Sequence, residues 1–263
     1  MKIGFIGTGN MGGAMIDGIL ASKTILPSDI YVSDIAEATL EKYQKRGVFV
    51  STDNQKTASC ADYIFLTVKP QFYETVLSEL KDSAQKVYIT VAPGITTAFV
   101  RAMLSPETKV VRTMPNTPAL VGEGVTAICR GTHVTDAEYE TVKQLISAFS
   151  EIYELDESLM DAVISVSGSS PAYVYLLIDA MARSGERQGI PYGTALHMAA
   201  KTVLGAAKLL LSSNEDAATL IDKVCSKGGT TIEAINSLKN NGFYPLIDEA
   251  MEACTHRALE LKK

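Results

Sequence analysis

The sequence predicts an α/β protein: a doubly wound, mostly parallel sheet over residues 1–156, followed by an all-helical domain over residues 157–263. In the first part, short apolar runs rich in Val and Ile alternate with helical patterns, as expected when crossover helices join parallel strands. In the second part the alternation stops, and helical patterns are separated by Gly, Ser and Asn. The two halves are therefore expected to form two domains.

The composition is that of an ordinary globular protein. Of 263 residues, 46% are hydrophobic and 21% are charged, and the net charge of -6 argues against a nucleic-acid binder, which usually carries a basic excess. The four cysteines form no CxxC pair and have no His at metal-ligand spacing, so we expect reduced thiols and no metal site. The first apolar run is too short for a signal peptide, and the longest uncharged run, 162–178, is too short to span a bilayer. We therefore expect a cytoplasmic protein.

Eight strands are expected in the first domain. They cover residues 2–6, 30–33, 48–50, 63–68, 87–91, 110–113, 125–129 and 152–155. Several end in loop-forming residues, such as Lys69-Pro70 and Pro93-Gly94. Because ligands of open parallel sheets bind at the carboxyl ends of the strands, we expect the binding site at these loops.

A long apolar helix opens the second domain. Ser169-Ser170 followed by Pro171 predicts a helix N-cap with proline at the first helical position, and the helix over 172–188 is apolar on nearly every face through Met181. Such a helix needs cover on all sides, so we expect a homodimer packed through these helices. The alternative is a helix at the centre of one subunit's own bundle.

The sequence Gly7-Thr8-Gly9-Asn10-Met11-Gly12 matches the pattern GxGxxG between the first strand and a helix over 10–21. Gly7 allows a tight turn, Gly9 leaves room for a pyrophosphate, and Gly12 lets helix and strand approach closely. The helix N-terminus offers unpaired amides and a partial positive charge to phosphates. The alternative is a glycine-rich turn without a ligand, but the strand before it and the helix after it predict a dinucleotide-binding domain of the Rossmann type.

Asp34 follows the second strand, 22 residues after Gly12, where a carboxylate can accept hydrogen bonds from the adenosine ribose. Asp34 by itself favours NADH, because it would repel a 2'-phosphate. Ser33 could nevertheless donate to such a phosphate, and Lys42 or Arg46 could reach it. The alternative is a capping box formed with Glu37, three residues further along.

Residues 224–234 form the most unusual segment of the helical half, with two glycines and two threonines before a helix that ends near Gly242. Backbone amides at that helix start could bind a substrate carboxylate, and the hydroxyls of Ser226, Thr230 and Thr231 could hydrogen-bond a neighbouring heteroatom. The alternative is a capping box between Thr230 and Glu233. The residues alone leave both interpretations open.

Five motifs together resemble the pyrroline-5-carboxylate reductase family. They are GTGNMG at 7–12, TVKP at 67–70, MPNTP at 114–118, GSSPAYV at 168–174 and CSKGGTTIEA at 225–234. The resemblance implies a Rossmann domain, a helical domain that interlocks with a partner copy, and reduction of L-1-pyrroline-5-carboxylate to L-proline with NADPH or NADH. This reaction is the last step of proline biosynthesis.

The resemblance also assigns cofactor-binding residues. They are Ile6, Gly7, Thr8, Gly9, Asn10, Met11 and Gly12 at the turn, Ser33, Asp34 and Asn54 around the ribose, and Thr67, Val68, Lys69, Pro70, Ala92, Pro93, Gly94 and Asn116 at the strand ends. Without the resemblance, Lys69 would be interpreted as a surface lysine.

For the substrate, the resemblance assigns catalytic roles to Thr231 and Ser226, with Thr231 at the ring nitrogen. Substrate contacts are assigned to Lys223, Gly228, Gly229, Thr230, Thr231 and Glu157. Glu157 could instead cap a helix start. Lys227 stands where many members of the family have proline, and either it or Lys223 could attract the substrate carboxylate.

The expected chemistry needs no catalytic histidine, because the cyclic imine can be protonated before it binds and positioning is the main contribution of the protein. Two alternatives remain at this point. A beta-hydroxyacid dehydrogenase would need a catalytic lysine, and no matching motif surrounds Lys201, Lys208 or Lys223. A non-catalytic NAD(P)-sensing regulatory protein would bind the cofactor without turnover.

Overall fold

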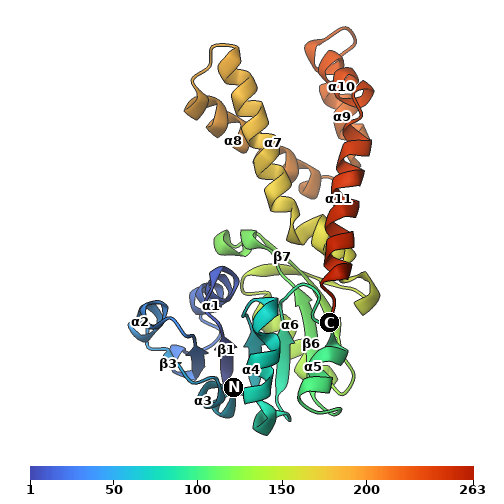
Figure 1. Ribbon diagram of the computed structural model, residues 1–263. Coiled ribbons are helices and arrows are strands. Elements are labelled where there is room, and N and C mark those ends of the chain that lie inside the picture. The colour runs from blue at the N-terminus through green and yellow to red at the C-terminus, as the bar shows by residue number, and fades with distance from the viewer. The chain divides into compact units, whose positions relative to one another are not determined.

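The computed structural model describes residues 1–263 and contains two compact units. The sheet unit comprises Met1–Pro171 and Cys254–Lys263, and the helical unit comprises Ala172–Ala253 (Figure 1). These units divide the chain later than residue 156, because Met160, Ile164 and Ala258 pack in one cluster with Met114 of the sheet. A domain boundary after residue 156 stays a prediction.

The sheet unit contains one eight-stranded sheet in the order β3-β2-β1-β4-β5-β6-β7-β8. The strands are β1 (Ile3–Ile6), β2 (Ile30–Ser33), β3 (Phe49–Ser51), β4 (Tyr63–Leu66), β5 (Val87–Thr90), β6 (Lys109–Met114), β7 (Gly124–Arg130) and β8 (Ser150–Glu154). Only the β6–β7 pair is antiparallel. The predicted doubly wound, mostly parallel sheet is therefore confirmed, and all eight strands lie within two residues of their expected bounds.

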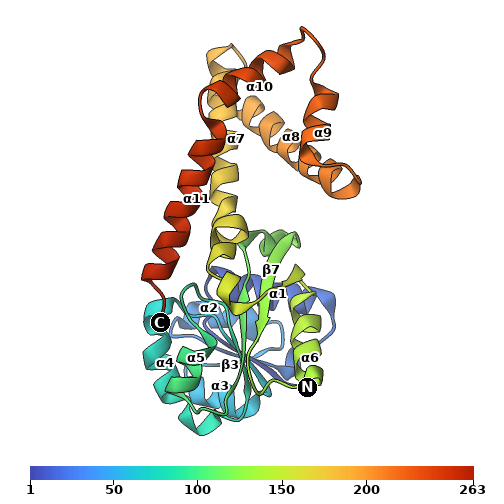
Figure 2. The ribbon, with the colours of Figure 1, turned by 90° about the vertical axis from the view of Figure 1, so that its right-hand side faces the viewer.

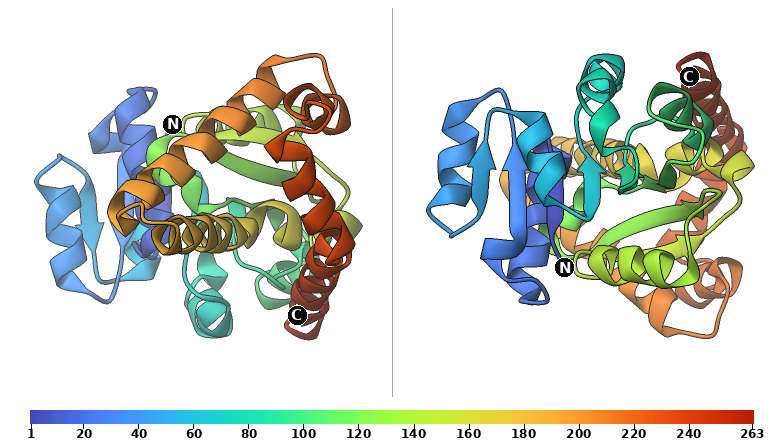
Figure 3. Two further views of the ribbon diagram at one scale, coloured as in Figure 1. Left: turned by 90° about the horizontal axis from the view of Figure 1, so that it is seen from above. Right: turned by 90° about the horizontal axis from the view of Figure 1, so that it is seen from below.

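Six helices cover the two faces of the sheet. They are α1 (Asn10–Ser22), α2 (Glu37–Gln44), α3 (Asn54–Cys60), α4 (Tyr73–Glu79), α5 (Thr97–Met103) and α6 (Asp136–Ile146). Helices α1, α2 and α6 pack in one core cluster, and α3, α4 and α5 pack in another. Figures 2 and 3 show α4 and α5 on one side of the strands and α6 on the other.

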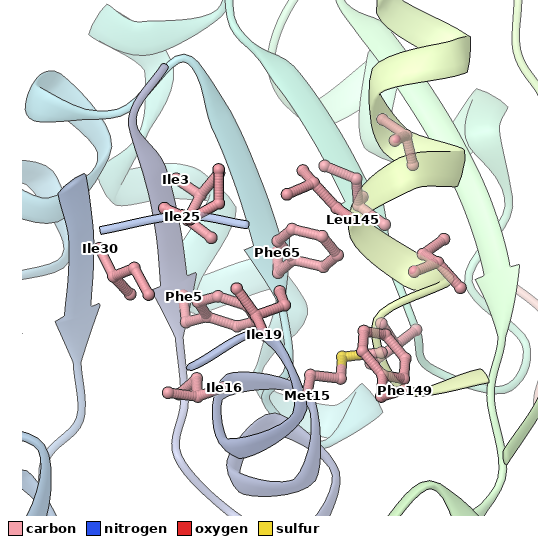
Figure 4. Packing of buried hydrophobic residues seen from close by; sticks show 14 of the residues in the cluster. Ile3, Phe5, Met15, Ile16, Ile19, Ile25, Ile30, Phe65, Leu145 and Phe149 are labelled. Atoms are coloured by element: carbon pink, nitrogen blue, oxygen red, sulfur yellow. The ribbon is translucent and has the colours of Figure 1, made fainter. Parts of the chain in front are cut away.

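The larger core cluster explains why α1 is fixed so firmly on the sheet. Phe5 of β1 and Phe65 of β4 stack with ring centroids 4.6 Å apart, and both are completely buried. Met15 and Phe149 lie in the same cluster (Figure 4). Burying each side chain of this size contributes about 1.5 to 3 kcal/mol. The packing holds the start of α1 in a fixed position beside β1.

The helical unit has almost no core of its own. Its helices are α7 (Ser170–Arg187), α8 (Tyr192–Ser212), α9 (Ala217–Val224), α10 (Thr230–Asn240) and α11 (Phe243–Glu260), of which the first and last begin or end in the sheet unit. On α7 only Ala182 is buried, whereas Tyr175 is 63% and Leu176 is 71% exposed. The alternative in which α7 is the centre of one subunit's own bundle is therefore wrong. No helix is both long and apolar enough to cross a membrane.

The expected N-cap before α7 is also wrong. Residues Ile164–Gly168 form a π-helical turn that leads directly into α7. Ser169 has helical dihedral angles, and its N–H donates to the carbonyl of Ile164 at 2.7 Å. The chain is already helical before Pro171, so no capping residue is needed there.

Short 3-10 turns complete the sheet unit. They cover Pro27–Asp29, Pro70–Phe72, Lys81–Ser83, Thr117–Val121 and Glu157–Leu159.

Candidate active site

The glycine turn after β1 has the close contacts that its pattern requires. Gly7 has φ +102, and Thr67 donates from Oγ1 to its carbonyl at 2.7 Å. A Cβ on Gly12 would overlap the carbonyl of Gly7 and the hydroxyl of Thr67, whereas a Cβ on Gly9 would meet no atom within 4 Å. Gly7 and Gly12 thus shape the turn, and Gly9 leaves space beside it.

Helix α1 begins at this turn without a cap. Gly9 is its N-cap residue, no side chain accepts from its first amides, and its first turn contains no acidic residue. The N-terminus of a helix without such partners presents N–H donors and a partial positive charge. This helix start can bind a pyrophosphate.

A cavity of about 530 Å³ lies beside this helix start, at the carboxyl ends of β1, β4, β5 and β6. Nine of the residues that line it were assigned to the cofactor in the sequence analysis: Gly9, Asn10, Met11, Thr67, Val68, Lys69, Pro70, Ala92 and Pro93. Val91, Met114, Pro115, Ile164, Gly168 and Ser169 line it as well. Lys69 makes no ion pair, so its ammonium is available to an anion in the cavity.

The π-helical turn and the residue after it contribute three cavity residues that the sequence analysis missed. Ile164, Gly168 and Ser169 line the cavity of about 530 Å³, and the thiol of Cys254 donates to Ser169 Oγ at 3.4 Å. Single-turn π-helices often occur at functional sites. The motif GSSP was visible in the sequence, but we interpreted it as a helix cap.

A second, smaller cavity of about 170 Å³ lies on the other side of the glycine turn. Six of its lining residues were assigned to the cofactor, namely Ile6, Gly7, Ser33, Asp34, Asn54 and Val68. The sequence analysis missed Ile35, Phe72, Thr75, Val76 and Glu79. Ile35 is 93% and Phe72 is 51% exposed, and such open apolar side chains are suited to cover a purine ring. The two cavities share Val68.

Asp34 is tied to the glycine turn. Its Oδ2 accepts from the N–H and the hydroxyl of Thr8, both at 2.6 Å, and its Oδ1 accepts from the N–H of Ala36 at 2.9 Å. Partial burial opposes ionisation, but these hydrogen bonds hold the pKa of Asp34 below its usual range. The N-cap of α2 is Ala36, so the capping box with Glu37 is not formed.

The two cations that could have reached a 2'-phosphate are occupied elsewhere. Lys42 Nζ lies 2.6 Å from Asp17 Oδ2, and Arg46 pairs with the other oxygen of Asp17. Neither residue lines the cavity of about 170 Å³.

Thr8, Gly12, Gly94 and Asn116 line neither of these two cavities. Thr8 holds Asp34 and Gly12 packs against the turn. Gly94, with φ +75, packs against the backbone of Leu261. Asn116 accepts from Val125 N and donates to Ser167 O. Direct cofactor contacts by these residues stay predictions.

Glu157 begins its own 3-10 turn, and its side chain reaches the start of another helix, α5. Its carboxylate accepts from the N–H of Thr97 at 2.8 Å and from the hydroxyl of Thr97 at 2.7 Å, at the first turn of α5. Its Oε1 lies 3.7 Å from Nη1 of Arg112. The structure thus gives Glu157 a helix-capping contact, and its role toward the substrate stays a prediction.

The assigned substrate residues other than Glu157 lie in the helical unit, in the last turn of α9, in the loop after it and in the first turn of α10. Gly229 is the N-cap of α10 and no side chain caps this helix, so the capping box of Thr230 and Glu233 is not formed. The N–H of Gly229 donates to Ser226 O at 3.0 Å, and Gly228 has φ +71. The first amides of α10 therefore remain available to a carboxylate.

The lysines near this loop differ in their pairing. Lys223 forms an ion pair with Glu215, whereas Lys227 is exposed and makes none. An attraction of the substrate carboxylate by either lysine stays a hypothesis, and of the two only Lys227 is free of an ion pair. No group of three or more His, Cys, Asp or Glu side chains is arranged to hold a metal ion, and all four cysteines are free.

Two protein families match this chain. Residues 157–261 match the family described as pyrroline-5-carboxylate reductase dimerisation. Residues 2–94 match the family described as NADP oxidoreductase coenzyme F420-dependent. The chain thus matches a dimerisation domain in its C-terminal part and a nucleotide-dependent oxidoreductase domain in its N-terminal part.

Full-length relatives and solved structures agree with these matches. The chain is 38% identical to the pyrroline-5-carboxylate reductase of Escherichia coli (strain K12), over 100% of this chain and 98% of the relative. It is 37% identical to pyrroline-5-carboxylate reductase 2 of Homo sapiens, over 100% of this chain and 84% of the relative. The structure of a pyrroline-5-carboxylate reductase from Coxiella burnetii matches with a TM-score of 0.93 and 32% identity, covering 100% and 98% of the two chains.

The Plasmodium falciparum pyrroline carboxylate reductase, solved with NADP bound, matches with a TM-score of 0.92 and 28% identity, over 100% of this chain and 98% of the other. These similarities run through both units. Together with the uncapped helix start and the cavities beside it, they show that the chain belongs to the pyrroline-5-carboxylate reductase family.

Proposed function

We propose that this protein reduces L-1-pyrroline-5-carboxylate to L-proline with NAD(P)H, the last step of proline biosynthesis. The observation that carries this function is the cavity of about 530 Å³ at the carboxyl ends of four strands, which opens at the uncapped start of α1. This geometry suits a dinucleotide, and the chain matches reductases over its whole length. Both observations support hydride transfer from a nicotinamide cofactor.

The residues of the sheet unit fit a dinucleotide. The space beside Gly9 and the free amides of α1 suit the pyrophosphate. The cavity of about 170 Å³ suits the adenosine, and the cavity of about 530 Å³ suits the nicotinamide. The cofactor supplies a hydride to the imine carbon. Lys69 supplies a positive charge, and Met114, Pro115 and Ile164 form an apolar wall that keeps water from the nicotinamide.

Most of the proposed substrate residues lie in the loop before α10 and in the first turn of α10. The first amides of α10 bind the carboxylate, because a helix start without a cap favours an anion. Thr231 holds the proton on the ring nitrogen by accepting its hydrogen bond, and Ser226 orients the ring. These roles need no change in the protonation of a protein group, because the imine takes up its proton before the hydride is transferred.

The protein forms a homo-oligomer, as its dimerisation domain indicates. The proposed assembly is a homodimer, or a larger oligomer of dimers, that covers the exposed apolar residues of α7 and α8. Tyr175, Leu176, Met198 and Leu211 are all exposed in the single chain, and this much apolar surface needs a partner. The small-molecule substrate and the second copy are the proposed partners, and the cytoplasm is the proposed location.

The test is the initial rate of NADH and NADPH oxidation by the purified protein, with and without L-1-pyrroline-5-carboxylate. Turnover that depends on this substrate supports the reductase. In a second assay, reduction of NAD+ or NADP+ with a beta-hydroxy acid as hydride donor would favour the hydroxyacid dehydrogenase. No turnover in folded protein that binds the cofactor would favour the regulatory protein.

A further inference from the structure

The wall of the cavity of about 170 Å³ has five polar lining residues, Ser33, Asp34, Asn54, Thr75 and Glu79, and the charges among them are all negative. Two of its lining residues are carboxylates, Asp34 after β2 and Glu79 at the end of α4. No lysine or arginine lines it. An adenosine ribose with two free hydroxyls can donate to such a wall, whereas a 2'-phosphate requires donors and positive charge.

Glu79 fixes the direction of the hydrogen bonds beside Asp34. Its Oε2 accepts from Asn54 Nδ2 at 2.8 Å, and Asn54 Oδ1 accepts from the Ser33 hydroxyl at 2.8 Å. Because a carboxylate can only accept, Glu79 turns the amide nitrogen of Asn54 toward itself and the amide oxygen toward Ser33. The hydroxyl proton of Ser33 is thereby engaged by Asn54 and is not free to be donated to a phosphate.

The carboxylate of Asp34 cannot easily turn away from a bound phosphate either. Both of its oxygens already accept hydrogen bonds from Thr8 and Ala36, so the carboxylate is held in place and stays charged. A phosphate beside it would meet a fixed negative charge rather than one that can turn away. The cations on and after α2 do not compensate, because Lys42 and Arg46 both pair with Asp17.

We propose that this pocket selects NADH over NADPH, with Asp34 as the first specificity determinant and Glu79, acting through Asn54, as the second. The proposal rests on the proposed NAD(P)H-dependent function. It gives Glu79 a role that neither its sequence context nor the similarity to NADP oxidoreductases indicates. It also resolves the cofactor choice that the sequence left open.

The test measures the Kd of each reduced cofactor for the full-length protein. Binding is detected by the change in nicotinamide fluorescence, and no pyrroline substrate is present. We expect the Kd of NADPH to exceed that of NADH about 10- to 100-fold at low salt. The ratio is expected to narrow as salt is added, because the repulsion is electrostatic. Equal affinities, tighter NADPH binding or no binding of either cofactor would overturn the proposal.

Variants separate the two carboxylates. The quantity compared is the ratio of the NADPH Kd to the NADH Kd. Asp34→Ser is expected to lower this ratio at least about tenfold and Glu79→Gln a few-fold, mainly because NADPH binds more tightly. Glu74→Gln is the matched control, because it removes the same charge from the same helix outside the cavity; its ratio is expected to stay that of the unmodified protein. An unchanged ratio in folded Glu79→Gln, as judged by thermal unfolding, would remove Glu79 from the proposal.

The binding experiment distinguishes this proposal from the proposed function. A protein that prefers NADH but does not reduce L-1-pyrroline-5-carboxylate would contradict the function and support the selectivity. A protein that reduces this substrate but binds NADPH more tightly would do the reverse.

Discussion

Asp161 and Arg112 form an ion pair that is almost completely removed from solvent. Asp161 Oδ1 lies 2.5 Å from Arg112 Nη2, and the two side chains are 3% and 0% exposed. Lys262 Nζ lies 2.9 Å from the other oxygen of Asp161. One carboxylate thus joins strand β6, the segment after β8 and the C-terminal segment of the chain, all within the sheet unit.

Replacing Asp161 by Asn is expected to lower the free energy of unfolding by at most about 3 to 5 kcal/mol, because it removes the nearer of the two carboxylates that face the buried guanidinium of Arg112 and leaves only Glu157, at 3.7 Å. Two nitrogens of Arg112 already lack a hydrogen-bond partner. Urea denaturation at fixed protein concentration measures the change. Asp136→Asn is the control, because its pair with Arg130 is exposed and its loss should leave stability nearly unchanged. Equal effects of the two variants would contradict the role given to Asp161.

The same pair predicts a dependence of stability on pH. Burial alone would raise the pKa of Asp161, but the hydrogen bonds from Lys262 and Arg112 outweigh it and hold the pKa below its usual range. A group with a lowered pKa stabilises the fold above its unfolded pKa, about 3.9, and this contribution is lost as the pH falls through its folded pKa. The stability gap between the unmodified protein and Asp161→Asn should therefore shrink below about pH 4. A gap that stays constant on acidification would show that ionisation of Asp161 is not its source.

Alanine at Gly9 is expected to separate binding from folding. A Cβ there meets no protein atom but enters the space assigned to the pyrophosphate, so stability should change little and cofactor affinity should fall at least about tenfold. Gly12→Ala is the contrasting variant: its Cβ would overlap the carbonyl of Gly7, and we expect a loss of stability. Fluorescence titration and thermal unfolding report the two effects. Unchanged affinity in Gly9→Ala would move the pyrophosphate away from this turn.

Thr231→Ala is expected to lower kcat/KM for L-1-pyrroline-5-carboxylate by about one to two orders of magnitude, which corresponds to the loss of one hydrogen bond to a charged group. Thr231→Ser keeps the hydroxyl and should retain most of the rate. Steady-state kinetics at saturating cofactor give both values. Kinetics of the alanine variant that equal those of the unmodified protein would remove Thr231 from the mechanism.

The sheet could be predicted from the sequence because buried parallel strands are short runs of Val and Ile between loop residues. The glycine turn could be predicted for a similar reason, since each glycine has a separate steric role that its spacing reveals. Asp34 was found because it follows a strand at a fixed distance from that turn.

Other features depend on contacts between distant parts of the chain. Glu79 ends an ordinary helix, and only the folded structure brings it to Asn54, 25 residues away, and to the cavity of about 170 Å³. The π-helical turn before α7 resembles a helix cap in sequence, because Ser is common as the N-cap residue and Pro is common at the first position of a helix. Gly94 was assigned to the cofactor, but the space that its missing Cβ leaves is filled by the backbone of Leu261, 167 residues later.

The measurement that tests the central claim most directly is the transfer of deuterium from reduced cofactor labelled at C4 of the nicotinamide. The purified protein is incubated with L-1-pyrroline-5-carboxylate and with each C4-labelled epimer in turn, and the proline formed is examined by NMR. Hydride transfer to the imine carbon predicts one deuterium at C5 of L-proline from one of the two epimers. Unlabelled proline from both epimers, or no proline from folded protein that binds the cofactor, would contradict it.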